Sequence, residues 1–100
     1  MAVVSKVLAR TAAATTSTTL YTTPSGTTAV LTNIVICNPT TAAVTASMTI
    51  DSVDLLGSVS IGANSVFGFD LKQVVPDGDI IAGSASSTDV DFHLSGVEIA

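Results

Sequence analysis

Residues 44–51 have the sequence VTASMTID, and this stretch decides the fold class. Every second residue from Val44 to Ile50 is apolar, and the residues between them are threonine or serine. Successive side chains of a β-strand point to opposite faces, so this period of two predicts a strand with one buried face. The same alternation recurs in residues 58–61, 66–71 and 90–95.

Turn sequences separate these segments at short intervals. They contain proline, glycine or asparagine, at residues 24–26, 38–39, 62–64 and 76–79. These residue types preset or tolerate the backbone angles that tight turns need. The abundant threonine, valine and isoleucine favour strands over helices. The pattern predicts an all-β fold of seven or eight antiparallel strands, either a small β-sandwich or a barrel, and most simply a jelly-roll sandwich.

Two segments carry finer expectations about burial. Residues 28–38 are apolar on both alternating phases, which predicts a central strand covered on both faces. Cys37 would then be buried and unreactive. Near the end of the chain we expect the alternation to shift phase at Gly96, with a bulge that turns Val97 and Ile99 inward.

The N-terminal segment is predicted to be distinct from the rest. We expect residues 1–23 to form an extended arm or edge strand, and residues 24–100 to form the β-sandwich domain. Residues 11–23 are rich in threonine, which favours extended backbone, and lack the high net charge of ordinary disorder. Two alternatives stay open, a flexible segment and a short helix with the apolar residues of positions 3–8 along one side.

The composition is unusual for a free globular domain. Only 11% of the residues are charged and 47% are hydrophobic, whereas soluble domains carry about 25% charged residues. The apolar runs are far shorter than the roughly 20 residues of a membrane span, and Lys6 and Arg10 interrupt the N-terminus where a signal peptide would be apolar. We therefore expect no membrane association, and a surface that other protein chains cover.

The charge balance argues against nucleic acid as a partner. The net charge is −5, and Lys6, Arg10 and Lys72 are the only cationic side chains apart from His93. Phosphate binding needs a basic patch, which this composition does not supply. The single cysteine excludes an intramolecular disulfide and suits synthesis in a reducing cytoplasm.

Candidate chemical sites are sparse. His93 is expected on the same strand face as Asp91 and Ser95, but a zinc site needs at least three convergent ligands. A Ser-His-Asp triad lacks the G-x-S-x-G turn that would support it. Asp77 and Asp79 have the composition of a tight turn, with a calcium loop as the alternative. We therefore predict no catalytic residues, no metal site, no cofactor and no enzymatic activity.

Two segments, Leu20–Met48 and Phe69–Ile99, resemble a family of small virion proteins of tailed bacteriophages. The shared pattern begins with Leu-Tyr-Thr-x-Pro and continues into an apolar strand that ends Ile-Cys-Asn. A Gly-Asp turn follows, and the chain closes with Phe-His-Leu-Ser-Gly-Val-Glu-Ile. The resemblance implies a jelly-roll head-decoration or tail-associated protein. It carries over no catalytic or ligand-binding residue.

Together these arguments predict a capsid decoration (cement) protein that bridges capsomers on the outer surface of the virion. It would assemble in the cytoplasm of the host bacterium, with the major capsid protein and copies of itself, as a trimer, for partners. The alternatives are a tail or baseplate protein and a receptor- or glycan-binding module. The expected contact residues are Val3, Val4, Val7, Leu8, Leu20 and Tyr21.

Overall fold

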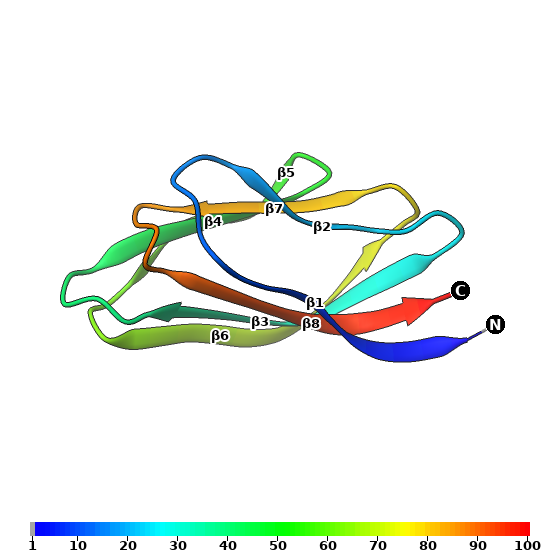
Figure 1. The fold of residues 1–100 in the computed structure, drawn as a ribbon, viewed down its shortest axis with the longest axis horizontal. Helices are drawn as coiled ribbons and strands as arrows, with labels where there is room; N and C mark the ends of the chain where they lie inside the picture. Colours follow the sequence, from blue (N-terminus) through cyan, green and yellow to red (C-terminus); the bar gives the residue numbers. More distant parts are fainter. Residues whose placement is uncertain (1) are drawn as a thin grey trace.

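The computed structural model describes residues 2–100 and confirms the predicted all-β sandwich. Eight antiparallel strands form two packed sheets (Figure 1). No helix that is long and apolar enough to cross a membrane occurs in residues 2–100. The strands are β1 Val3–Ala12, β2 Thr18–Thr22, β3 Thr28–Asn38, β4 Val44–Ile50, β5 Val53–Ile61, β6 Ser65–Val75, β7 Ile80–Ala85 and β8 Asp91–Ile99.

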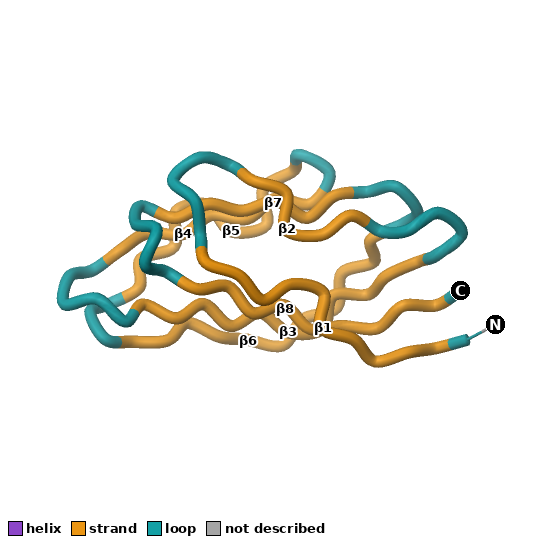
Figure 2. The backbone as a smooth tube through the Cα atoms, viewed as in Figure 1, coloured by secondary structure: helices purple, strands orange, loops and turns teal. Residues whose placement is uncertain are grey.

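The connectivity is that of a jelly roll. Sheet A has the strand order β1-β8-β3-β6, and sheet B has the order β2-β7-β4-β5. The β4–β5 hairpin is the one connection that stays within a sheet, and the six other loops of residues 2–100 cross between sheets (Figure 2). This crossing pattern places the inner faces of the two sheets against each other, with the core between them.

The core lies between the sheets, and it corrects one expectation for β3. Ala29, Leu31, Ile34 and Ile36 are fully buried on the inner face of β3, whereas the other face of this strand is only half-buried. Cys37 lies on that outer face and is half-buried, so the prediction of a fully buried thiol was wrong. The reason is that no helix or strand of residues 2–100 covers the outer side of sheet A.

The predicted phase shift at Gly96 was also wrong. Strand β8 keeps its alternation throughout: Gly96 is buried, and Val97 and Ile99 lie on the outer face. The extra residues belong to the neighbouring strands, where the register shifts at Leu8 of β1 and at Thr32 of β3. A buried glycine contributes no apolar side chain, so the alternation in the sequence does not indicate that Gly96 faces inward.

The N-terminal residues are ordered as strands on both sheets. Residues 3–12 form an edge strand of sheet A and residues 18–22 form an edge strand of sheet B, so the helical alternative is wrong. The connecting segment is held by backbone hydrogen bonds from Ala13 N to Val90 O at 2.7 Å and from Ala85 N to Ala14 O at 3.0 Å.

Two turns at the end of the sandwich near the termini share one construction. In residues 24–27 and 76–79 the fourth N–H donates to the first carbonyl, at 3.2 and 3.0 Å. The third residue of each is a glycine with positive φ, 76° at Gly26 and 81° at Gly78, a conformation that glycine adopts without steric cost. The Asp77 carboxylate accepts a hydrogen bond from the Gly26 N–H at 2.8 Å and so docks one turn on the other.

Candidate assembly surface

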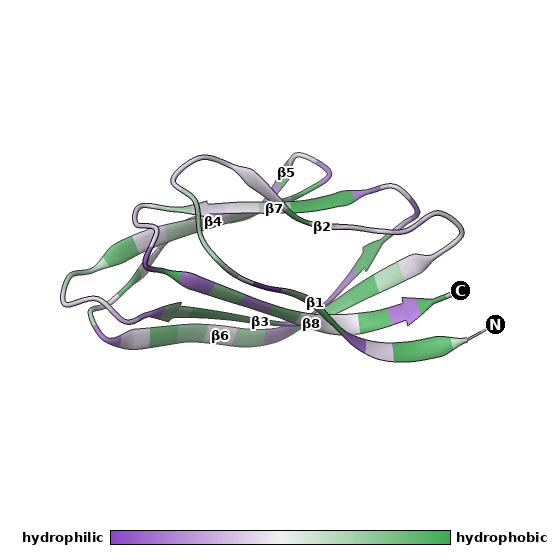
Figure 3. Cartoon of the chain, in the orientation of Figure 1, coloured by the Kyte–Doolittle hydropathy of each residue, from purple (hydrophilic) through white to green (hydrophobic). Residues whose placement is uncertain are grey.

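The outer faces of the two sheets differ in chemistry. On sheet B the alternation places hydroxyl groups outward, at Thr19, Thr45, Ser47, Thr49, Ser60 and Ser84. On sheet A it places valines outward, at Val3, Val7, Val30, Val35, Val66, Val74 and Val97. We call this second set the valine face. Figure 3 shows the hydropathy of each strand in this arrangement.

Three valines of this face are direct neighbours across strands. Val97 of β8 pairs with Val30 of β3, which in turn pairs with Val74 of β6. Val66 and Val74 are each 62% exposed. Directly paired residues of an antiparallel sheet have adjacent side chains, so this row is a continuous apolar strip. Contiguous exposed apolar surface of this kind marks an interaction site in many proteins.

The six predicted contact residues divide into two groups. Val3, Val4 and Val7 are 64%, 53% and 45% exposed on β1. The other three side chains pack within the chain itself: Leu8 and Tyr21 are buried, and Leu20 is partly buried against the core. The bulge in β1 explains Leu8, because the extra residue turns this side chain inward beside Ala9.

Two shallow depressions flank the valines near β1 and β8. One, of about 390 Å³, is lined by residues that include Val7, Thr32 and Val97, where the bulges bend the neighbouring strands. The other, of about 270 Å³, is lined by residues 10–12 together with Asp91 and His93. Both are open and belong to the outer side of sheet A.

His93 lies where the sequence predicted, on the same strand face as Asp91 and Ser95. Its cross-strand neighbours are Arg10 of β1 and Val35 of β3. No group of three or more His, Cys, Asp or Glu side chains that could hold a metal ion occurs among residues 2–100. His93 itself is a half-buried residue on the outer face of sheet A.

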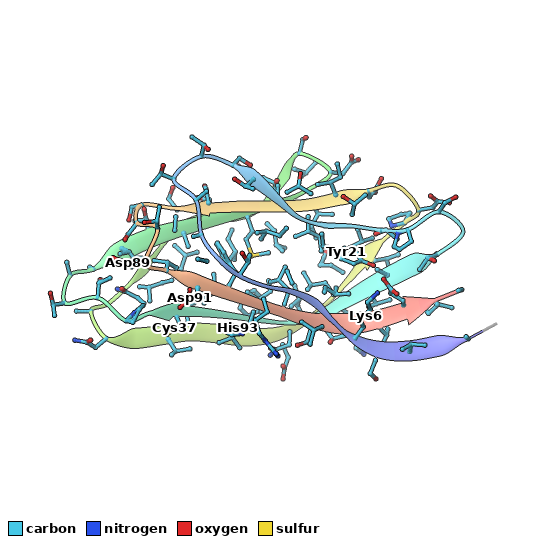
Figure 4. The ribbon with its side chains drawn as sticks, in the orientation of Figure 1. Lys6, Tyr21, Cys37, Asp89, Asp91 and His93 are labelled. Carbon is cyan, nitrogen blue, oxygen red and sulfur yellow. The ribbon has the colours of Figure 1, made fainter. Side chains whose placement is uncertain are left out.

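A polar cluster joins the two sheets along the edge formed by β1 and β2. Tyr21 of β2 donates a hydrogen bond to the Glu98 carboxylate of β8, and Lys6 of β1 forms an ion pair with the same carboxylate at 3.1 Å. The Glu98 side chain is 15% exposed and that of Lys6 is 48% exposed. Figure 4 shows Lys6 and Tyr21 in this region of the sandwich.

The electrostatics of the cluster favour one protonation state. Burial, followed by the hydrogen bond to the Glu98 carboxylate, raises the pKa of Tyr21 to about 12. The hydrogen bond from Tyr21, followed by that from Lys6, lowers the pKa of Glu98 below its usual range. At neutral pH the phenol of Tyr21 therefore stays protonated and the carboxylate of Glu98 stays ionised. The hydrogen bond between them needs this combination, because the phenol donates and the carboxylate accepts.

Sequence patterns carried no signal for this cluster. Lys6 and Glu98 are 92 positions apart, and Tyr21 and Glu98 are 77 apart. Only the pairing of β1 with β8 and the closure of the two sheets bring these side chains together. Tyr21 is one of the predicted contact residues, and its hydroxyl has a partner within the chain.

The opposite end of the sandwich is organised around Asn38, which is fully buried. Its Nδ2 donates to the carbonyl oxygens of Ala42, Ile61 and Gly62, at 2.9, 3.2 and 2.9 Å. Its Oδ1 accepts from the backbone N–H and the hydroxyl of Thr40, at 3.1 and 2.6 Å. One amide side chain thus ties the β3–β4 loop to the β5–β6 loop and has no capacity left for an external ligand.

These features define the class of the molecule as an eight-stranded jelly roll with one hydroxyl-rich face and one valine-rich face. No protein-family model matches the chain, and no curated protein matches it. The solved structures that share its fold include the crystal structure of the T13 particle of infectious bursal disease virus. The TM-score is 0.58 at 8% identity, over 97% of this chain and 30% of that chain.

A structure of the Gx strain of infectious bursal disease virus gives a TM-score of 0.53 at 13% identity, over 97% of this chain and 32% of that chain. The chain thus spans about a third of the length of these two viral chains. A family 35 carbohydrate-binding module from Clostridium thermocellum gives a TM-score of 0.43 at 13% identity, over 96% of this chain and 89% of that one. A TM-score of 0.43 is too low for the similarity to this module to support a conclusion about the chain.

Proposed function

We propose that this chain is a structural protein of a virus particle, and specifically a capsid decoration protein of a tailed bacteriophage. It would sit on the outer surface of the head and bridge capsomers. The observation that carries the proposal is the valine face of sheet A, which includes a row of three cross-strand valines and exposed valines on β1 and β6. The jelly roll shared with chains of a virus particle and the resemblance of the sequence to phage virion proteins support it.

The mechanism would be mechanical. Burial of apolar surface contributes roughly 25 cal/mol per Å². Valine also loses little rotamer freedom when it is buried, because it is already restricted at χ1. Each contact would be modest, but a subunit that touches two capsomers gains by multivalency. Valines on a rigid sheet provide such contacts with little loss of entropy.

The proposed partners are the major capsid protein and further copies of the chain. The predicted trimer and a pair of copies are the two arrangements that sedimentation of the full chain would distinguish. The valine face supplies the contact to the capsid. The hydroxyl-rich face of sheet B would remain towards solvent, since its threonine and serine side chains hydrogen-bond to water.

Quantitative mass spectrometry of purified virions from the source phage tests the location. A copy number equal to that of the major capsid protein, or a simple fraction of it, is expected for a decoration protein. A ratio tens of times lower would overturn decoration in favour of a tail or baseplate protein. Absence from the virion would overturn the virion proposal and return attention to a receptor- or glycan-binding module.

Variants of the valine face test the contact itself. The double substitution Val3→Asp and Val7→Asp places two charges on exposed positions of β1. We expect it to weaken co-sedimentation with undecorated heads by at least tenfold. Thr45→Asp on the exposed outer face of sheet B is the matched control and should bind normally. Equal binding by the wild type, the double variant and Thr45→Asp would show that the valine face is not the contact.

A further inference from the structure

The sandwich is open along the side where β6 and β5 lie. Strand β6 has 11 residues and one hydrogen-bonded neighbour, β3, within residues 2–100. Its inward-facing Phe67, Phe69 and Leu71 pack against the core but remain only partly buried. The two phenyl rings lie edge to face with their centroids 5.4 Å apart. Core side chains therefore reach the surface beside a long unpaired strand edge.

An unpaired edge of this length is a template for another strand. Proteins that avoid such pairing often place a lysine on the edge, and β6 carries Lys72. Two residues away, Asp70 lies on the same outer face by the alternation of the strand. A lysine and an aspartate at this spacing do not block pairing with an identical strand. They select one register of it.

We propose that β6 pairs antiparallel with β6 of a second copy of the chain, about a two-fold axis at Leu71. In this register Asp70 lies opposite Lys72 of the partner subunit, and Lys72 lies opposite Asp70 of the partner subunit. Opposite charges directly across an antiparallel pair stabilise it, and like charges destabilise it. The two-fold axis forms this favourable pair twice.

The same register suits two further pairs of residues of β6. Phe67 lies opposite Val75 of the partner subunit on the inner side, so the open edge of the core is covered. On the outer side, the exposed Val74 lies opposite Gly68 of the partner subunit, where no side chain competes for space. Main-chain hydrogen bonds supply affinity and the alternating side chains supply specificity, as in other cases of strand addition.

The other three edge strands suit self-pairing less well. Strand β1 carries Lys6 and Arg10 with no acidic residue, so self-pairing would bring like charges together. Strand β2 has only five residues. Strand β5 has an aspartate and no cation, so a self-paired β5 would form no pair of opposite charges. Of the four edges, β6 alone combines length with charges of both signs.

Pairing through β6 would extend the valine face as well. The two A sheets would form one continuous eight-stranded sheet, and their outer valines would lie on one side of it. This inference concerns the contact between copies and does not depend on the virion location. If the chain does not dimerise through β6, the decoration proposal still stands. If the chain is absent from the virion, the pairing through β6 still stands.

Sedimentation equilibrium of the full chain over a wide concentration range tests the inference. A monomer–dimer equilibrium is expected. Lys72→Asp places two aspartates opposite each other and should weaken the dimer by at least tenfold. The double variant Asp70→Lys with Lys72→Asp exchanges the charges and should restore the dimer. Arg10→Asp makes the same charge change on the opposite edge of sheet A and should leave the dimer intact.

Several outcomes would overturn the inference. These are a monomer at every concentration, a trimer, a dimer that Lys72→Asp leaves unchanged, or an equal loss in Arg10→Asp. Lys72 is exposed, so its replacement should leave the fold intact, and circular dichroism checks this. Hydrogen exchange gives a second measure, because the outward-directed amides of β6 should gain protection as the concentration rises. Constant exchange in β6 while the mass doubles would place the contact elsewhere.

Discussion

The hydroxyl of Tyr21 in β2 donates a hydrogen bond to the carboxylate of Glu98 in β8, and this bond connects sheet B to sheet A. It lies on the side of the sandwich where β1 and β2 form the two edges. The opposite side, between β5 and β6, has partly buried aromatic side chains instead. The two open sides of the jelly roll are therefore closed in different ways, one by a polar cluster and one, as we propose, by a second copy.

Replacement of Tyr21 by phenylalanine should lower the free energy of unfolding by about 1–2 kcal/mol at pH 7, because a hydrogen bond to a charged acceptor is lost. The pKa of Tyr21 is raised to about 12, so the stabilisation is full below its ordinary pKa of 10. It is lost as the pH rises from 10 to about 12. Urea unfolding over this range should show a steeper loss in the wild type than in Tyr21→Phe.

Lys6→Met is the control for this prediction. It removes the ion pair but keeps the Tyr21 bond, and a half-exposed ion pair contributes less than about 1 kcal/mol. The Lys6 variant should therefore retain the alkaline loss of stability. A Tyr21→Phe protein as stable as the wild type would contradict a stabilising role for the bond.

Glu98→Gln should change the acid side of the pH profile. The hydrogen bond from Tyr21 and then that from Lys6 lower the pKa of Glu98 below its ordinary value of 4.5. A lowered carboxyl pKa stabilises the fold fully above the ordinary value, and this stabilisation is lost as the pH falls through the folded value. Thermal unfolding between pH 6 and pH 2 should therefore show a smaller decline in Glu98→Gln. Asp89→Asn in an exposed loop removes the same charge and should keep the wild-type decline.

Asn38→Asp should be among the most damaging substitutions in the chain. The new carboxylate would place an acceptor against the carbonyl oxygens that Nδ2 now satisfies, in a fully buried position. We expect a loss of about 3 kcal/mol or more in the free energy of unfolding, measured in urea. Asn64→Asp, in the adjacent exposed loop, should change it by less than about 0.5 kcal/mol. Equal stability of the two variants would refute the structural role of Asn38.

Gly96→Ala tests the close approach of β8 to β3. A Cβ at Gly96 would collide with the carbonyl oxygen of Val30, so the two strands would have to separate. A cost of about 3 kcal/mol follows from overpacking of this kind. Gly57→Ala is the matched control, because its Cβ would meet nothing within 4 Å, and it should alter stability by less than about 0.5 kcal/mol. A fully stable Gly96→Ala protein would mean that the strands are not so close.

Local pattern was sufficient for the fold class. The alternation from Val44 to Ile50 predicts a strand that the structure contains over the same residues. The turns at Gly26 and Gly78 were equally visible, because the backbone angles there depend on the residue itself. Seven or eight short strands without a helical period permit a sandwich or a barrel.

Local pattern failed where a position depends on what lies across the sheet. The inner face of β3 and its outer face have the same apolar character in the sequence, but only one of them is covered. Leu8 faces inward because β1 bulges against β8, and no neighbour in the sequence signals that bulge. The buried position of Gly96 has no side chain to reveal it.

The sequence by itself determined that this protein is a small all-β sandwich with too few charges for a fully solvated surface, since periodicity and composition are properties of the chain alone. Only the tertiary structure decided which valines remain outside, which strand edges stay unpaired, and that Lys6, Tyr21 and Glu98 meet. These outcomes depend on strand order and register. Both are set by contacts between segments far apart in the chain, which no local pattern encodes.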